Sequence, residues 1–397
     1  MKRLIIYVIV LFSVSTILKA QGNRSELIAS TLNEIEENNT TLKALKLETE
    51  AVMLENKTNL TLADPEFGFN YLWGSPSSIG KRKDFTATQS FDFTTLLGYK
   101  KGVANNQNLL AEIQYKKNRI DILLEAEKQI IELISYNSLI KELDKRLDYA
   151  NQIVAAYQKG FDLGENNILD LNKAKMEQIK IKNEVKRANI EKEIIFNNLK
   201  TLNGNIPIDI DVSQYNLFDL PSDFETWYAE TSLSSPVLEY ANATVALNKE
   251  QLKYNKSLAA PTISAGYMME DVVGEKYQGI TLGMSIPIWS NKNRIKQAKT
   301  AIRAAESAQN DAKIQFFNNL NNFYIRSKAL KEIAESYAQG LIQVDNAYLL
   351  KKALDAGKIS LLDYIVETQL YYELIIQAID SEKEYRISLA DLYATEL

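Results

Sequence analysis

An alternating stretch in the second half of the chain decides the fold. Residues 279–289 run Gly-Ile-Thr-Leu-Gly-Met-Ser-Ile-Pro-Ile-Trp, with large apolar side chains at every second position and mostly small residues between them. Successive side chains of a strand point to opposite faces, so this pattern predicts a strand with one apolar face. About ten such residues ending in an aromatic side chain are typical of a membrane-spanning β-strand. An amphipathic hairpin on a soluble core gives the same alternation, so the choice depends on the rest of the chain.

Three more stretches alternate in the same way. In the first half, strands are expected at about 66–74 and 84–93, and the quoted stretch has a partner strand that starts near residue 262. The basic run Lys81–Lys83 is expected in the loop of the first hairpin, solvated or, as a second interpretation, in contact with lipid head groups. Asp92 is expected on the polar face of its strand, where it would line a pore.

The chain is also internally duplicated. Three pairs of similar segments recur at nearly one offset, which chance does not produce easily. They are 64–71 with 260–267, 88–93 with 283–288, and 164–170 with 357–363. The sequence therefore predicts two copies of one plan: helix, strand, strand, very long helix, turn and long helix.

Long helices occupy the rest of each copy. No proline interrupts the chain from Thr95 to about Lys159 or from Asn291 to Asp355. About 65 helical residues span roughly 100 Å, which is too long to fold back into a compact domain. In each copy the two shorter helices, at about 40–62 and 165–203 in the first, together match the long one, so we expect them to stack end to end beside it. The second long helix carries a seven-residue seam typical of coiled coils: Ile295, Ile302, Phe316, Phe323, Leu330, Tyr337 and Val344.

The amino terminus has the pattern of a secretory signal. Lys2 and Arg3 precede an apolar run from Leu4 to Ile17, and Ala20 ends a possible cleavage site. The run is too short for a spanning helix, so a single membrane anchor is the lesser alternative. No later segment is apolar enough to span as a helix, and any membrane crossing would have to use strands. The expected organisation is a signal peptide at 1–20, a first repeat at 21–203 with a hairpin at about 66–93 and a helical tip near 160–168, a connector at 204–235, and a second repeat at 236–397 with a hairpin at about 262–288 and a tip near 354–362.

Composition excludes several function classes. The chain has 397 residues, a net charge of -5, and neither cysteine nor histidine. Thiol nucleophiles, histidine-based triads and Cys/His metal sites are therefore impossible. No block of Lys and Arg forms a phosphate-binding stripe for nucleic acid, and no glycine-rich phosphate loop is present. We expect no enzyme, no cofactor and no resident metal.

The strand count implies assembly. Four strands cannot close a barrel, and a sheet edge cannot stay unpaired in lipid. Two copies would give eight strands around a filled interior, whereas three give twelve strands around an aqueous bore. The small Thr, Ser and Gly residues of the polar strand faces suit such a lumen.

With these features the chain resembles the outer membrane efflux protein (TolC) family. The resemblance covers essentially the whole mature chain and rests on Pro65, Pro261, Ser285–Trp289 and the turn motifs Gly164–Asp170 and Gly357–Asp363. It implies a mainly α fold with a transmembrane β part: a homotrimer whose twelve-stranded barrel, four strands per chain, sits in outer-membrane lipid and continues as a coiled-coil α-helical tunnel in the periplasm.

By implication the protein would be a passive, porin-like duct of a tripartite efflux or type I secretion system. A periplasmic adaptor and an inner-membrane pump of the RND or ABC type would be its partners. The cargo stays open between drugs, metal ions and secreted polypeptide. The alternative function is a structural or adhesive coiled-coil protein of the periplasm.

The resemblance also suggests gate residues at the helical tips. Asp363 matches the first of two aspartates that ring the tunnel entrance in known members, and Asp170 is its counterpart in the first repeat. The second aspartate is replaced by Val366, and the family's Tyr and Arg lock positions hold Leu354 and Ile359, so a gate here has to use other contacts. The alternative for both aspartates is a helix-start charge that favours the local dipole.

Apolar residues at the tips are candidate contacts for an adaptor. Gly164 and Gly357 are expected to supply left-handed or cramped backbone in the two turns. The candidate docking residues beside them are Phe161, Leu163, Leu354 and Ile359. Ordinary packing between helices is the alternative for all four.

Overall fold

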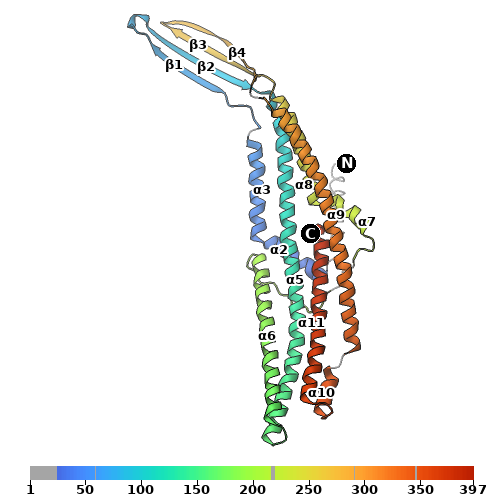
Figure 1. Ribbon diagram of the computed structural model, residues 1–397. Helices are drawn as coiled ribbons and strands as arrows, with labels where there is room; N and C mark the ends of the chain where they lie inside the picture. Colours follow the sequence, from blue (N-terminus) through green and yellow to red (C-terminus); the bar gives the residue numbers. More distant parts are fainter. Residues whose placement is uncertain (1–24, 59, 216–219, 290, 345–346) are drawn as a thin grey trace, which may run out of the picture. The chain divides into compact units, whose positions relative to one another are not determined.

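The computed structural model describes residues 25–58, 60–215, 220–289, 291–344 and 347–397 (Figure 1). They form two compact units: unit 1 holds the described residues within Met1–Lys43, Asn118–Leu233 and Phe317–Leu397, and unit 2 holds those within Ala44–Lys117 and Ser234–Phe316. The expected signal peptide lies outside the described residues. None of the described helices is both long and apolar enough to cross a membrane.

The element order follows the predicted plan, so the fold class is confirmed as mainly α with four antiparallel strands. The helix–strand–strand–helix–helix series occurs twice. The elements are α2 (Glu26–Asn38), α3 (Thr40–Thr58), β1 (Glu66–Trp73), η1 (Ser77–Ile79), β2 (Lys81–Phe91), α4 (Phe93–Leu96), α5 (Tyr99–Asp162), α6 (Ile168–Leu202), α7 (Phe224–Ser234), α8 (Pro236–Ser257), β3 (Thr262–Val272), β4 (Glu275–Ser285), α9 (Arg294–Gln343), α10 (Ala347–Asp355), α11 (Leu361–Leu392) and η2 (Ala394–Glu396).

The four strands of unit 2 form one antiparallel sheet in the order β1-β2-β3-β4 (Figure 1). The prediction that Lys81–Lys83 form a loop is wrong: they begin β2, opposite Trp73, Leu72 and Tyr71 of β1. Basic residues can stay in this strand because Arg82 forms ion pairs with acidic residues of the sheet. Asp92 falls just past β2 and caps α4 by accepting a hydrogen bond from the Thr95 N–H.

The core of unit 1 holds α2, α5, α6 and the connector together. Ile35 of α2, Ile130 of α5 and Leu199 of α6 are fully buried in one cluster, which Ile208 and Ile210 of the connector join. The connector thus inserts apolar side chains into the helical core. The break between α2 and α3 falls at Asn39, whose side-chain amide donates to the Leu202 carbonyl at 2.7 Å. The start of α3 therefore meets the end of α6, as the length argument requires.

The second long helix is interrupted, contrary to the prediction of one run to Asp355. Helix α9 ends at Gln343 and α10 begins at Ala347. Gly340, in the last turn of α9, is a weak helix former. Beside the expected seam, α9 also buries a neighbouring row of small side chains: Ala298, Ala305, Ser327 and Ala334.

Candidate functional site: an amphipathic sheet and two helical tips

One face of the sheet is apolar and open to its surroundings. The register sets Phe67, Ala87, Tyr267 and Ile280 side by side across all four strands. Large apolar side chains on this face are strongly exposed, with Ile280 at 82%. A soluble protein buries such a patch or uses it for contact. The neighbouring rows continue it with Phe69, Phe85, Met269, Leu282 and Met284.

The opposite face is polar and crowded. It carries Thr, Ser and Gly in rows such as Thr88, Gly266 and Thr281. A Cβ atom on Gly266 would lie 2.5 Å from the Ala87 carbonyl oxygen, and one on Gly283 would lie 2.5 Å from the Ser264 hydroxyl. Glycine is required at Gly266 because the Ala87 carbonyl oxygen lies where a side chain would stand, whereas a side chain at Gly283 would need the Ser264 hydroxyl to turn away. A face of short polar groups is what a hydrated bore needs.

The sheet has two open edges. Within the described residues β1 pairs only with β2, and β4 only with β3. Their outer backbone groups lack ladder partners inside the chain, and such edges invite pairing with another chain.

The tip between α5 and α6 leaves its apolar side chains exposed. Gly164 has φ 76°, and the Glu165 N–H donates to the Gly160 carbonyl across it at 2.8 Å, as in a Schellman turn. Phe161 and Leu163 are exposed beside this turn, Leu163 at 64%. The geometry at this tip suits contact with another molecule.

The aspartate of this first tip belongs to a helix cap. Asn167 caps α6 by accepting from the Asp170 N–H at 2.8 Å, and its amide donates to the Asp170 carboxylate at 2.7 Å. Lys173 adds an ion pair at 3.0 Å. These contacts agree with the alternative interpretation of Asp170, in which its charge stabilises the start of a helix.

The tip between α10 and α11 has the same backbone but different packing. Gly357 has φ 64°, and the Lys358 N–H donates to the Ala353 carbonyl at 2.8 Å. Leu354 is 9% exposed, in a cluster with Ile153 of α5 and Ala174 of α6, and Ile359 packs against that cluster. Within this chain Leu354 and Ile359 therefore take part in ordinary packing between helices, the alternative to an adaptor contact.

Asp363 also takes part in a helix cap. Ser360 and Asp363 form a reciprocal capping box at the start of α11. Hydrogen bonds from the Ser360 hydroxyl and backbone N–H hold the pKa of Asp363 below its ordinary value. Val366 lies one turn further on, exposed between Leu362 and Leu370 on one stripe of α11. The stripe is available to a neighbouring chain.

A buried arginine that the sequence did not point to links the α5–α6 hairpin to helix α11. Arg146 of α5 forms ion pairs with Glu177 and Glu184 of α6. Its guanidinium lies 4.9 Å from the centre of the Tyr372 ring of α11. Burial raises the pKa of Tyr364, a member of the tip cluster, to about 12, so that phenol stays neutral. The available signal was spacing, since Arg146 shares a helical stripe with Leu143, Ala150 and Ile153.

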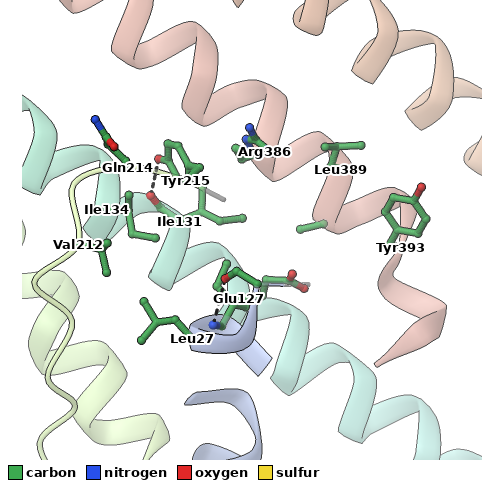
Figure 2. A pocket seen from close by; sticks show the side chains of 13 residues that line it. Leu27, Glu127, Ile131, Ile134, Val212, Gln214, Tyr215, Arg386, Leu389 and Tyr393 are labelled. Carbon is green, nitrogen blue, oxygen red and sulfur yellow. Dashed lines mark hydrogen bonds between the residues drawn. The ribbon is translucent and has the colours of Figure 1, made fainter. Parts of the chain in front are cut away.

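The cavity in unit 1 shown in Figure 2 is too small for cargo. Its volume is about 30 Å³, room for one or two water molecules. Tyr215 of the connector donates to the Ile131 carbonyl at 2.8 Å, and Arg386 lies over the Tyr215 ring at 5.5 Å and pairs with Glu382. The cavity belongs to the packing of the connector on the helices. Among the described residues no cluster of carboxylates is arranged to hold a metal ion.

Comparison with known proteins finds similarity in structure alone. No family model matches the chain, and no curated protein matches it significantly. CusC, described as forming a transmembrane channel, superposes with a TM-score of 0.78 at 13% identity, covering 94% of this chain and 92% of its own. The CmeC outer membrane channel of Campylobacter jejuni gives 0.74 at 16% identity, over 94% and 85%. The MtrE outer membrane channel of Neisseria gonorrhoeae gives 0.71 at 16%, over 93% and 88%. The chain has the fold of these channels.

Proposed function

We propose that this chain is one protomer of a trimeric outer-membrane channel of an efflux system, with its helical part in the periplasm. The observation that carries the proposal is the sheet of unit 2, which exposes an apolar face, crowds small polar groups on the other and ends in two open edges. Three copies joined edge to edge would pair every backbone group, turn the apolar face to lipid and surround a polar bore. The shared fold with outer-membrane channels supports this assignment.

Transport in this proposal involves no chemical change of the cargo. A passive duct needs an energised partner, so we propose an inner-membrane pump of the RND or ABC type and a periplasmic adaptor. The exposed Phe161 and Leu163 of the first tip are the proposed adaptor contacts. Asp170, Asp363 and Val366 are proposed to border the periplasmic entrance. The cargo, whether drug, metal ion or polypeptide, is set by the pump.

The test is the native mass of the protein extracted from outer membranes in mild detergent, measured by light scattering. We expect a particle of three chains that stays associated without heat. A monomer or dimer recovered without detergent would contradict the channel and favour the periplasmic coiled-coil alternative.

A substitution sharpens this test. An arginine at Ile280, in the middle of the exposed apolar face, should cost about 2–4 kcal/mol if that face meets the bilayer midplane. The yield of outer-membrane trimer should fall accordingly. Ile280→Leu, which keeps an apolar side chain at the same position, is the matched control and should leave the yield unchanged.

A further inference from the structure

The basic run at the start of β2 is divided between the two faces of the sheet. Lys81 and Lys83 lie on the apolar face, opposite Trp73 and Tyr71. The Lys81 ammonium lies 5.9 Å from the centre of the Tyr71 ring, which confirms its side. Lys276 of β4 joins them, because the register runs from Lys83 through Asp271 to Lys276.

The polar face at the same level has the opposite charge. Arg82 donates to Asp84 at 2.7 Å and to Glu270 at 2.8 Å, so its charge is used within that face. Glu275 adds a further carboxylate there by its position in the register. The charged residues at this end of the apolar face are three lysines and one aspartate, Asp271. The Asp271 carboxylate accepts a hydrogen bond from the Gly274 N–H. The sheet end is therefore basic on the side proposed to face lipid and acidic on the side proposed to face the bore.

The lysines also form the border of the apolar band. The next row beyond Tyr71 and Lys83 holds Phe69, Phe85 and Met269. Lysine stems lie along apolar surface while the ammonium reaches the head-group level, and Tyr and Trp are favoured at that level. Such a site needs a ligand with an anionic head and an apolar body.

We propose that Lys81, Lys83 and Lys276 bind the phosphate groups of an anionic membrane lipid, so that each trimer carries a basic belt around its outer end. The inference rests on the proposed function, because it takes the apolar face to contact lipid. The committed occupant is a phosphorylated lipid of the surrounding leaflet, since inorganic phosphate alone would make no use of the adjoining aromatic residues.

The experiment uses the full-length trimer in mild detergent and two lipids, a diphosphorylated lipid A and the same lipid after removal of its phosphates. Native mass spectrometry measures the affinity of each. The intact protein should prefer the phosphorylated lipid. The variant K81Q/K83Q/K276Q should lose affinity for it by about fivefold for each lysine, while binding of the dephosphorylated lipid stays constant.

Two controls separate this effect from charge loss and misfolding. The variant K57Q/K101Q/K299Q removes three exposed lysines from helices α3, α5 and α9 and should bind like the intact protein. The variant K81R/K83R/K276R keeps the charges and should retain the lipid. Equal binding of the two lipids by the intact protein would overturn the proposal. So would an unchanged affinity for the phosphorylated lipid in K81Q/K83Q/K276Q, provided that this variant is still trimeric.

A competition arm distinguishes the source of the phosphate. Millimolar inorganic phosphate should leave most of the lipid bound, and complete displacement would contradict a lipid site. Failure of the channel assignment looks different, because it gives a soluble particle that is not a trimer. That result would remove both proposals, whereas a trimer without lipid preference would remove only this one.

Discussion

The two helical tips of unit 1 share a motif and a backbone, yet they present different surfaces. Each has a glycine at positive φ and an aspartate three residues after the helix cap. At matching positions, however, Phe161 and Ile168 of the first tip are exposed, whereas Leu354 and Leu361 of the second are buried. The turn motif fixes how the chain reverses. Whether the side chains beside it pack or remain free depends on the neighbouring hairpin.

This difference assigns separate roles to the tips. The second tip packs its leucines against α5 and α6 and so ties the two hairpins together. The first keeps its apolar side chains outside that contact. Sequence similarity between the tips therefore does not imply similar docking, and substitutions at matched positions should behave differently.

The largest effect is expected from Leu354→Ala. Loss of a buried leucine side chain costs about 2–5 kcal/mol because a cavity remains. Hydrogen exchange of α10 and α11 should lose protection by that amount. Leu163→Ala in the exposed first tip is the control and should stay within about 0.5 kcal/mol. Equal losses at the two tips would show that both are buried in the assembled protein.

The next effect concerns the arginine that links the hairpins. Arg146→Met keeps an unbranched apolar stem but removes the guanidinium and leaves Glu177 and Glu184 without their cation, which should cost about 1.5–3 kcal/mol. Thermal unfolding in detergent and exchange of α6 measure the loss. Lys145→Met removes a neighbouring exposed charge paired only with Glu142 and should cost under about 1 kcal/mol. A loss no larger in Arg146→Met than in this control would contradict the role of the ion pairs.

A smaller effect is expected at the cap of the first tip. Asn167→Ala removes the acceptor for the Asp170 N–H and should destabilise the start of α6 by about 1 kcal/mol. Exchange of the first turn of α6 reports it. Asn167→Ser retains a capping oxygen and should behave almost like the original residue, and similar losses in the two variants would argue against the cap.

The smallest effect is a pH dependence confined to the second tip. Because the Ser360 hydrogen bonds lower the pKa of Asp363 from 3.8, the folded pKa lies below the unfolded one. The stabilisation is therefore complete above about pH 4 and is lost as the pH falls through the folded value. Ser360→Ala should raise the Asp363 pKa toward 3.8, measured by NMR titration of labelled aspartate. An unchanged pKa would show that the capping box is not formed in solution.

Much of the fold could be predicted because it depends on periodic patterns. Alternation located all four strands, and proline-free runs located the helices of both halves. The last strand was predicted too far, because β4 ends at Ser285, two residues before Pro287, which lacks a backbone donor for the ladder. The errors occur where local chemistry resembles something else. Lys81–Lys83 look like a solvated loop, yet cross-strand pairing with Glu270 keeps Arg82 in the sheet. Asp92 fits the alternation of its strand but forms a cap, and the same polar residue types serve both roles.

The candidate site was less predictable because burial is set by distant parts of the chain. No local pattern distinguishes Leu354 from Phe161, and the difference arises only when α5 and α6 pack against the second tip. Arg146 was missed for the same reason, since its carboxylate partners lie on another helix. The positive φ of both glycines was predictable, because it depends on the local turn alone.

The crowded glycines of the sheet restrict how this protein can evolve. A side chain at Gly266 would collide with the Ala87 carbonyl oxygen of the adjacent strand, so a point mutation there cannot add a functional group to the polar surface. The polar surface therefore combines a position closed to variation with positions open to it, such as Gly279, where an added Cβ atom would meet no atom within 4 Å.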